Sequence, residues 1–138
     1  MQHTKRVPQW TNSINTIVPK FAYAGTHMVA DFWNGKVIKN KKELETLLRG
    51  AAKAANSNPL QLSIYKFKPR GITGVILLAE SHIAVHTWPE IGYIAIDIFT
   101  CGKKARPQKA LKFFENYLEP KKMDVNEIKR GVVEDNTT

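Results

Sequence analysis

Several short stretches of the chain alternate between hydrophobic and polar residues, as strands with one buried face do. The clearest is 93–101, where the isoleucines at the even positions face one way while Asp97 and Cys101 face the other. Similar patterns bounded by Asn, Gly and Pro predict further strands at 26–33, 62–67, 83–88 and 123–128.

Two stretches near these strands are less regular. Residues 75–79 are apolar at every position, which is expected of a strand that is covered on both faces or lies in the middle of a sheet. Val37 and Ile38 follow the Asn34-Gly35 turn signal and are interpreted as a short hairpin arm that continues the first strand.

Two segments instead follow the helical period. Asn40, with Glu43 three residues later, resembles an N-cap, and the helix is predicted to run to about Ala55. Pro107 opens a second helix and Pro120 ends it. The apolar stripes are Leu44, Leu47, Leu48, Ala51 and Ala55 in the first helix and Ala110, Phe113, Phe114, Tyr117 and Leu118 in the second.

The order strand, helix, strands, helix, strand predicts an α+β domain. We expect a two-layer sandwich in which a mostly antiparallel sheet carries both helices on one face. A chain of 138 residues has the size of one ordinary domain, which we place at 26–132. Residues 1–25 are interpreted as an N-terminal arm and 133–138 as a polar tail.

Composition and charge narrow the function classes. The chain is 43% hydrophobic and has no apolar run near the roughly 20 residues of a membrane span, so we expect no membrane partner. The first twenty residues lack the continuous apolar stretch of a secretory signal, so we expect a cytoplasmic protein. The net charge of +9 would suit nucleic acid, but the basic residues are spread from Lys5 to Arg130 without a known nucleic-acid motif. A solvated basic surface is favoured, and a nucleic-acid-binding module is kept as a rival function.

The thiol and the imidazoles suggest three kinds of chemistry. Cys101 is the only cysteine, so it is either a small buried hydrophobe or a free thiol. His82 and His86 could join it at zinc, but their β-branched neighbours favour a strand, where four residues span about 13 Å, and no metal is expected. A nucleophilic pair of Cys101 and His86 stays open, because sequence does not fix their separation.

The residues from Ala79 to Glu90 hold most of the chemical groups. Glu80 and Ser81 end an apolar run, where a carboxylate and a hydroxyl are costly to bury unless they are paired or used. The alternative is that Ser81 caps a turn by bonding to nearby backbone. The residues alone leave both interpretations open.

Three motifs in this part of the chain together resemble one family. They are Glu80-Ser81-His82, His86-Thr87-Trp88-Pro89-Glu90 and Asp97-x-Phe99-Thr100-Cys101-Gly102. In order and spacing they are similar to the small prokaryotic, pyruvoyl-dependent form of S-adenosylmethionine decarboxylase proenzyme. The resemblance runs from about His27 to Gly131 and is strongest between Phe67 and Gly102.

The resemblance implies self-processing. In the family the serine hydroxyl, here Ser81, attacks the carbonyl of the preceding residue, here Glu80, and forms an ester. β-Elimination and hydrolysis then leave a pyruvoyl group, giving a β chain of residues 1–80 and an α chain of residues 81–138. That covalent cofactor forms a Schiff base with the substrate amine and acts as the electron sink, so neither pyridoxal phosphate nor metal is needed.

The resemblance also implies roles for individual residues. His86 matches the proton acceptor of processing, and Cys101 matches the proton donor to the substrate carbon. Glu90 matches the carboxylate that binds the ribose, and Phe67 matches the ring that stacks on adenine. Thr73 stands where the family often has a serine that assists processing, and it keeps the hydroxyl.

The resemblance can be checked against the Ser81–His86 distance and against the charge of the substrate, and it also implies an oligomeric state. Five extended residues separate Ser81 from His86 by about 16 Å, so we expect a bend, or approach from a paired strand or from a second subunit. The family usually pairs protomers, which implies a homodimer of processed units. The substrate is a sulfonium cation, so local groups such as Glu90 and Phe67 must outweigh the net positive charge.

The predicted function is decarboxylation of S-adenosylmethionine, which supplies the aminopropyl donor for spermidine and related polyamines. The alternative within the same chemistry is a pyruvoyl-dependent arginine decarboxylase, because electron-sink residues do not identify the side chain being bound. The more remote alternative is the nucleic-acid-binding module.

Overall fold

The computed structural model describes residues 23–133, so the predicted arm at 1–25 and tail at 133–138 lie almost entirely outside the described residues. Within this part the chain forms β1 (Gly25–Trp33), α1 (Lys41–Ala54), β2 (Pro59–Lys66), β3 (Ile72–Leu78), β4 (Ser81–Trp88), the 3-10 turn η2 (Pro89–Ile91), β5 (Tyr93–Thr100), α2 (Pro107–Leu118) and β6 (Lys122–Arg130).

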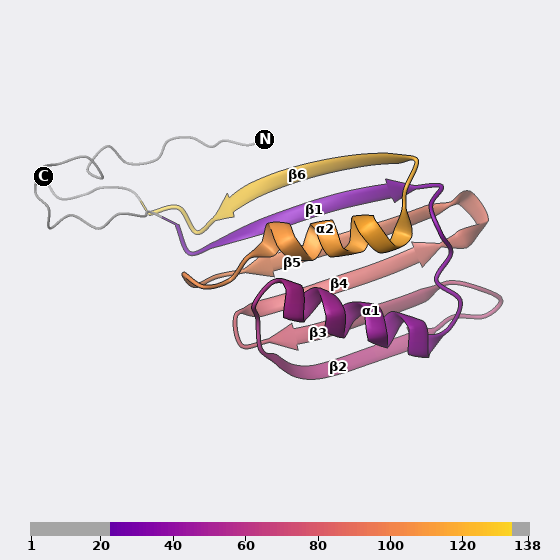
Figure 1. Cartoon of the computed structure of the whole chain (residues 1–138), viewed down its shortest axis with the longest axis horizontal. Helices are drawn as coiled ribbons and strands as arrows, with labels where there is room; N and C mark the ends of the chain where they lie inside the picture. The colour runs from indigo at the N-terminus through magenta and orange to yellow at the C-terminus, as the bar shows by residue number, and fades with distance from the viewer. Residues whose placement is uncertain (1–22, 134–138) are drawn as a thin grey trace, which may run out of the picture.

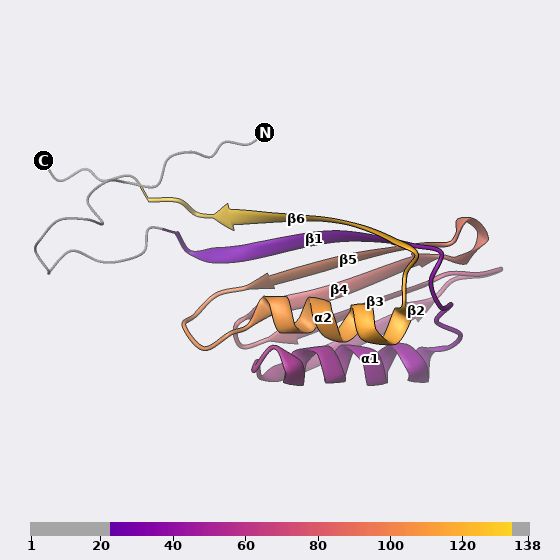
Figure 2. The ribbon, with the colours of Figure 1, turned by 45° about the horizontal axis from the view of Figure 1, so that its top comes forward.

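The strands make one six-stranded sheet in the order β2-β3-β4-β5-β1-β6, with every neighbouring pair antiparallel. Both helices run along the same face of this sheet (Figures 1 and 2). The predicted α+β two-layer sandwich is therefore confirmed. The opposite face, here called the open face, is covered by no element among residues 23–133.

The core lies between the helices and the sheet. On β5 the three isoleucines at 94, 96 and 98 are buried beneath the helices, as the alternation predicted. The apolar stripe of α1 is buried with them, and burial of each of its leucine side chains stabilises the fold by roughly 1.5–3 kcal/mol. A Cβ on Gly74 would lie 2.7 Å from Leu44 Cδ2, so this glycine lets α1 approach β3 closely.

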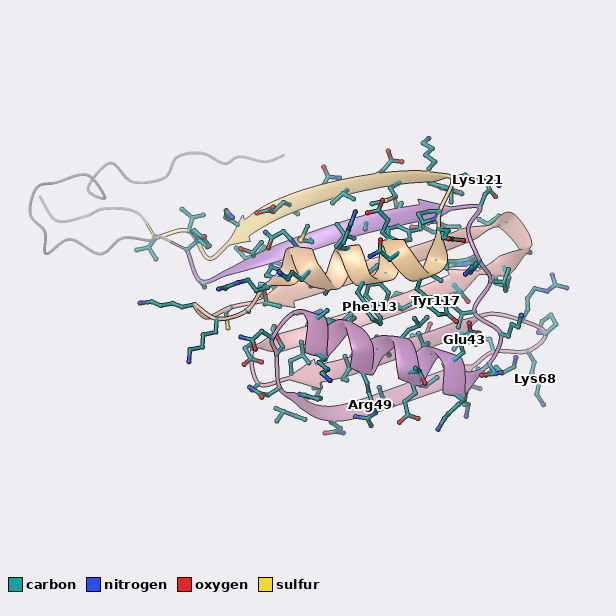
Figure 3. All side chains as sticks on the ribbon, in the orientation of Figure 1. Glu43, Arg49, Lys68, Phe113, Tyr117 and Lys121 are labelled. Carbon is teal, nitrogen blue, oxygen red and sulfur yellow. The ribbon has the colours of Figure 1, made fainter. Side chains whose placement is uncertain are left out.

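The ends of the helices are fixed by polar contacts. Asn40 Oδ1 accepts from the Glu43 backbone N–H at 2.8 Å, which confirms the predicted N-cap. Glu43 also accepts from the Lys39 backbone N–H at 2.7 Å and from the Tyr117 hydroxyl at 2.5 Å. Figure 3 shows Glu43 and Tyr117 at the same end of the two helices, so this contact ties α1 to α2.

One local prediction was wrong. Val37 and Ile38 form no hairpin arm: the Lys36 N–H donates to the Leu118 carbonyl at 2.7 Å, and Ile38 is buried in the core. The reason is that β1 already pairs on both edges, with β5 and β6, so the chain leaves the sheet for the helix layer. For the apolar run at 75–79, the second of the two expectations is confirmed: β3 lies inside the sheet, paired with β2 on one side and β4 on the other. It is not covered on both faces, since Leu77 is 44% exposed on the open face.

No described helix, α1 and α2 included, is both long and apolar enough to cross a membrane.

Candidate active site

The turn between β3 and β4 holds the Glu80–Ser81 peptide. Leu78 and Ser81 form the last pair of the hairpin, so Ala79 and Glu80 alone make the connection. Ser81, the first residue after this connection, has a φ of 144°, a region that residues with a side chain rarely adopt and that costs of order 1–3 kcal/mol. The backbone is therefore strained at the residue that the sequence marked as the nucleophile.

The carbonyl of Glu80 accepts two hydrogen bonds from Cys101. The backbone N–H of Cys101 lies 3.0 Å from it and Sγ lies 3.2 Å from it. The register brings them together, because Ser81 is opposite Thr100 and Cys101 is the next residue. The donors polarise this carbonyl and are placed to hold negative charge that develops on its oxygen.

Gly25 at the start of β1 lies against Thr100 and Cys101. A Cβ there would lie 2.8 Å from the Thr100 carbonyl oxygen and 3.4 Å from Cys101 Cβ. A larger residue would therefore displace the end of β5 that carries the two donors.

The side chain of Glu80 is held separately, by Asn58. Oε1 accepts from the Asn58 backbone N–H at 2.9 Å, and Oε2 accepts from Asn58 Nδ2 at 3.1 Å. Asn58 is not predicted from the sequence as a site residue, because the run from 56 to 59 is typical of the end of a helix. An asparagine also suits a turn, so no local signal separates the two roles.

The remaining candidates lie at the other end of β4. His86 pairs with Thr73 across β3 and β4, and Thr73 Oγ1 lies 3.1 Å from His86 Nδ1. Phe67 directly follows β2 at this end, with its ring 4.8 Å from that of Tyr65 and 46% exposed. Glu90 lies in η2 directly after β4 and is also exposed.

The two groups of residues are far apart in one chain. β4 is continuous from Ser81 to Trp88 and keeps its register with both neighbours, so the predicted bend is absent. Ser81 pairs with Leu78 and Thr100 and not with any strand position near His86. The imidazole is therefore about 16 Å along the strand from the serine.

The same geometry bears on the two other arrangements considered for the thiol and the imidazoles. His86 is opposite Ala95 on β5, and Cys101 is six residues further along, so a nucleophilic Cys101–His86 pair within one chain is wrong. His82 and His86 are likewise separated on a regular strand. Between residues 23 and 133 no three His, Cys, Asp or Glu side chains are grouped as ligands for a metal ion.

The open face carries aromatic rings across three strands at the His86 end. Tyr93 stacks on Trp33 with ring centroids 4.6 Å apart and on Trp88 at 5.1 Å. The Tyr93 hydroxyl donates to Asp31 at 2.6 Å. Burial, with this hydrogen bond and the charge of Asp31, raises the pKa of Tyr93 to about 12, so the phenol stays protonated at neutral pH.

A second polar group on the open face surrounds His27. Arg130 Nη1 lies 3.1 Å from His27 Nδ1, so Nδ1 accepts and the neutral ring carries its proton on Nε2. Nε2 is buried without a hydrogen bond to any described residue and lies 3.8 Å from Asp97 Oδ1. Burial is the largest cause that lowers the pKa of His27; Asp97 opposes it, and Arg130 adds to it.

Comparisons with known proteins agree with the resemblance seen in the motifs. The family model described as S-adenosylmethionine decarboxylase matches residues 26–131. An S-adenosylmethionine decarboxylase proenzyme of Methanococcus maripaludis is 39% identical over 113 residues, covering 80% of this chain and 93% of that protein. The proenzyme of a Sulfurihydrogenibium species is 45% identical over 111 residues, covering 79% and 84%.

A solved structure gives the same answer for the fold. The crystal structure of the adenosylmethionine decarboxylase from Aquifex aeolicus VF5 superposes with a TM-score of 0.78 at 37% identity, covering 85% of this chain and 98% of that one. Because the family model spans most of the chain and these relatives match over nearly their whole length, the chain belongs to the S-adenosylmethionine decarboxylase family.

Proposed function

We propose that this chain is a proenzyme that cuts itself between Glu80 and Ser81 and then decarboxylates S-adenosylmethionine, with the product serving polyamine synthesis. The observation that carries the proposal is the Glu80 carbonyl, which accepts two hydrogen bonds from Cys101 beside a strained serine. The names of the matching relatives supply the substrate.

The first step moves an acyl group from nitrogen to oxygen. Ser81 Oγ attacks the Glu80 carbonyl carbon, the C–N bond breaks, and the hydroxyl proton ends on the Ser81 nitrogen. The result is an ester with a free amine. The Cys101 N–H and Sγ–H stabilise the oxyanion of the tetrahedral intermediate, and the release of strain at Ser81 favours the departure from the starting conformation.

The second step eliminates the ester. A base removes the Cα proton of residue 81, and the Cβ–O bond breaks, leaving Glu80 as a free carboxylate. The enamine that remains at residue 81 takes up water and loses ammonia, which yields the pyruvoyl group at the start of the α chain. We assign the base to His86, whose Nδ1 is in contact with the Thr73 hydroxyl, so the other ring nitrogen faces away from Thr73.

Because His86 cannot reach Ser81 in its own chain, we assign it to the Ser81 of a second copy. A two-fold axis through the open face brings the start of β4 in one copy to the end of β4 in the other, and both sites form at once. The aromatic rings and Leu77 on that face supply apolar area for the contact. The proposed assembly is a homodimer of processed protomers.

The proposed pyruvoyl group forms from Ser81 itself, so it is made beside Glu80 and Cys101 and no separate cofactor has to enter the site. A pyruvoyl group supplies an electron sink for the carbanion left by CO₂. Cys101 Sγ, which no longer needs to bond the Glu80 carbonyl after the cut, returns a proton to the substrate carbon. An exposed thiol used in this way requires a reducing compartment, so we propose the cytoplasm.

We assign substrate binding to residues at the other end of β4. The exposed ring of Phe67 offers a face for adenine, and Glu90 offers a carboxylate for the ribose hydroxyls. Aromatic rings and the carboxylates of Asp31 and Glu90 also favour a sulfonium cation locally, against the net charge of +9.

Intact-mass measurement of the purified protein tests the cleavage. We expect two fragments that meet between positions 80 and 81, and one 15.6 kDa species for Ser81→Ala. Ser63→Ala, an exposed serine on β2, is the control and is expected to be cut normally. A single 15.6 kDa species from the unmodified chain would overturn the proposal.

Release of labelled CO₂ tests the substrate. The cleaved protein is offered S-adenosylmethionine and arginine in parallel. Turnover of S-adenosylmethionine alone is the expected result, whereas turnover of arginine alone would assign the same chemistry to the other substrate.

A further inference from the structure

We propose that Asn58 is a positioning residue for the self-cleavage, because it holds the Glu80 side chain and thereby keeps the Glu80 carbonyl on the donors of Cys101. This inference rests on the proposed function, since it concerns the rate of the proposed cut. Asn58 does not touch the reacting atoms and acts through Glu80.

Asn58 binds the Glu80 carboxylate through two hydrogen bonds. Both Glu80 oxygens accept from Asn58, one from its backbone N–H and the other from its side-chain amide, and the Ala79 N–H donates to the Asn58 carbonyl at 2.9 Å. One residue therefore binds both members of the two-residue turn. No Lys or Arg between residues 23 and 133 forms an ion pair with Glu80, so Asn58 is its polar partner.

Asn58 is itself fixed, through the connection between α1 and β2. Ser57 is 7% exposed, and its N–H donates to the Ala52 carbonyl at 3.0 Å. Asn56 Nδ2 donates to the Lys104 carbonyl at 3.1 Å, and the Arg106 N–H donates to the Ala55 carbonyl at 2.8 Å. The short segment 55–58 is thus bonded both to the turn with Glu80 and to the loop that follows Cys101.

This arrangement matters because attack on the carbonyl needs a fixed geometry. The Glu80 peptide lies in a tight turn at the end of the sheet, and both donors to its carbonyl come from one residue, directly after β5. A rotation of that peptide would lose both donors at once. Hydrogen bonds to a charged carboxylate are among the stronger ones in proteins, so two of them can hold the peptide in place against such rotation.

A double-mutant cycle tests the contact between Asn58 and Glu80. It compares the unmodified chain, the single variants Asn58→Asp and Glu80→Gln, and the double variant. In Asn58→Asp a carboxylate replaces the amide, so two acceptors face each other, while size and backbone contacts are kept. We expect cleavage to slow by about 10–100-fold, the change that loss of one charge-assisted bond produces.

The combined variant Asn58→Asp/Glu80→Gln restores a donor and an acceptor in the reverse order. The amide introduced at position 80 can donate to the carboxylate introduced at position 58. The Asn58→Asp change should therefore slow cleavage by less than about threefold when it is measured against Glu80→Gln alone.

Cleavage is followed by intact mass over time, and the melting temperature of each chain is measured with Ser81→Ala added. Asn116→Asp, an exposed asparagine on α2, controls for the added charge and is expected to cut at the normal rate. A change that merely loosened the fold would slow cleavage equally in the chain that keeps Glu80 and in the chain that carries Glu80→Gln.

The outcomes separate the two proposals. If the unmodified chain is cut but Asn58→Asp has the same effect in both backgrounds, or none, the role of Asn58 is overturned and the proposed function stands. If the unmodified chain stays intact, the proposed function fails and the role of Asn58 fails with it.

Discussion

The two ends of β4 carry different halves of one proposed reaction. At its start the backbone is irregular: Ser81 has a strained φ directly after a tight turn, and two donors of Cys101 bind the Glu80 carbonyl. At its end the strand is regular, and side chains do the chemistry, with Thr73 bonded to His86. The first end has the proposed nucleophile and its target, and the second has the proposed base, so neither end would suffice within one chain.

This division has a physical consequence. A strand of eight residues is rigid in a sheet bonded on both sides, so the two halves cannot approach each other by bending. In the proposed dimer, a second copy turned by a two-fold axis brings the proposed base to the ester. The proposed processing is therefore coupled to assembly, and an isolated chain would be held at the stage before elimination.

The largest expected effect is complementation between the two ends. Ser81→Ala and His86→Ala chains, each expressed alone, should stay intact or stop at the ester. Co-expressed, they form mixed dimers in which the intact Ser81 of one chain meets the intact His86 of the other. We expect up to about half of the His86→Ala chains to be fully processed, measured by intact mass.

The control for this experiment removes the base from both chains. His86→Ala is co-expressed with the double variant Ser81→Ala/His86→Ala, and no processing is expected. If mixing the two single variants gave none either, the assignment of His86 to the partner copy would be wrong.

Cys101 lies at the first end of β4 and is expected to act in two steps, the cleavage and the later decarboxylation. Cys101→Ala removes one of the two donors to the Glu80 carbonyl and should slow cleavage by about 3–10-fold, while decarboxylation per cleaved chain falls by at least about 100-fold. Cys101→Ser keeps a donor, so cleavage should be faster than in Cys101→Ala with decarboxylation still poor. The assays are fragment mass over time and CO₂ release; a Cys101→Ala chain that never cleaves would contradict this division of roles.

Thr73 supports the second end and should have a smaller effect. Thr73→Val keeps the shape but removes the hydroxyl that contacts His86 Nδ1, so the imidazole loses its orientation. We expect elimination to slow by about 3–10-fold, with accumulation of the ester, which hydroxylamine traps. Thr73→Ser restores the hydroxyl and should recover most of the rate; equal rates for the valine and serine variants would exclude this role.

The smallest effect concerns the open face between the two ends. Because burial lowers the pKa of His27 below its ordinary 6.5, the unfolded chain binds this proton more tightly than the folded chain. The stabilisation is complete above about pH 6.5 and is lost as the pH falls below it. The melting temperature of Ser81→Ala should therefore drop by on the order of a few °C on acidification, and less in a chain that also carries His27→Gln. An unchanged drop in His27→Gln would show that other groups carry the pH dependence.

Local patterns accounted for much of the fold. The alternation along β5, the Asn40 cap and the proline that opens α2 each depend on neighbours within a few residues, and each prediction was confirmed. Prediction failed where the deciding contacts are distant. Ile38 leaves the sheet because both edges of β1 are occupied, and Asn58 gains its proposed role from a glutamate 22 positions away.

The sequence by itself determined the family resemblance: three motifs, with a glutamate before a serine, one thiol and a spaced histidine, point to the family and name the candidate residues. Only the tertiary structure decided how those residues are distributed. Antiparallel register placed Cys101 on the Glu80 carbonyl and Thr73 on His86, and the unbroken length of β4 kept the two pairs apart. Spacing along a chain fixes distance only once the strand is known to be straight, and that is a property of the whole sheet.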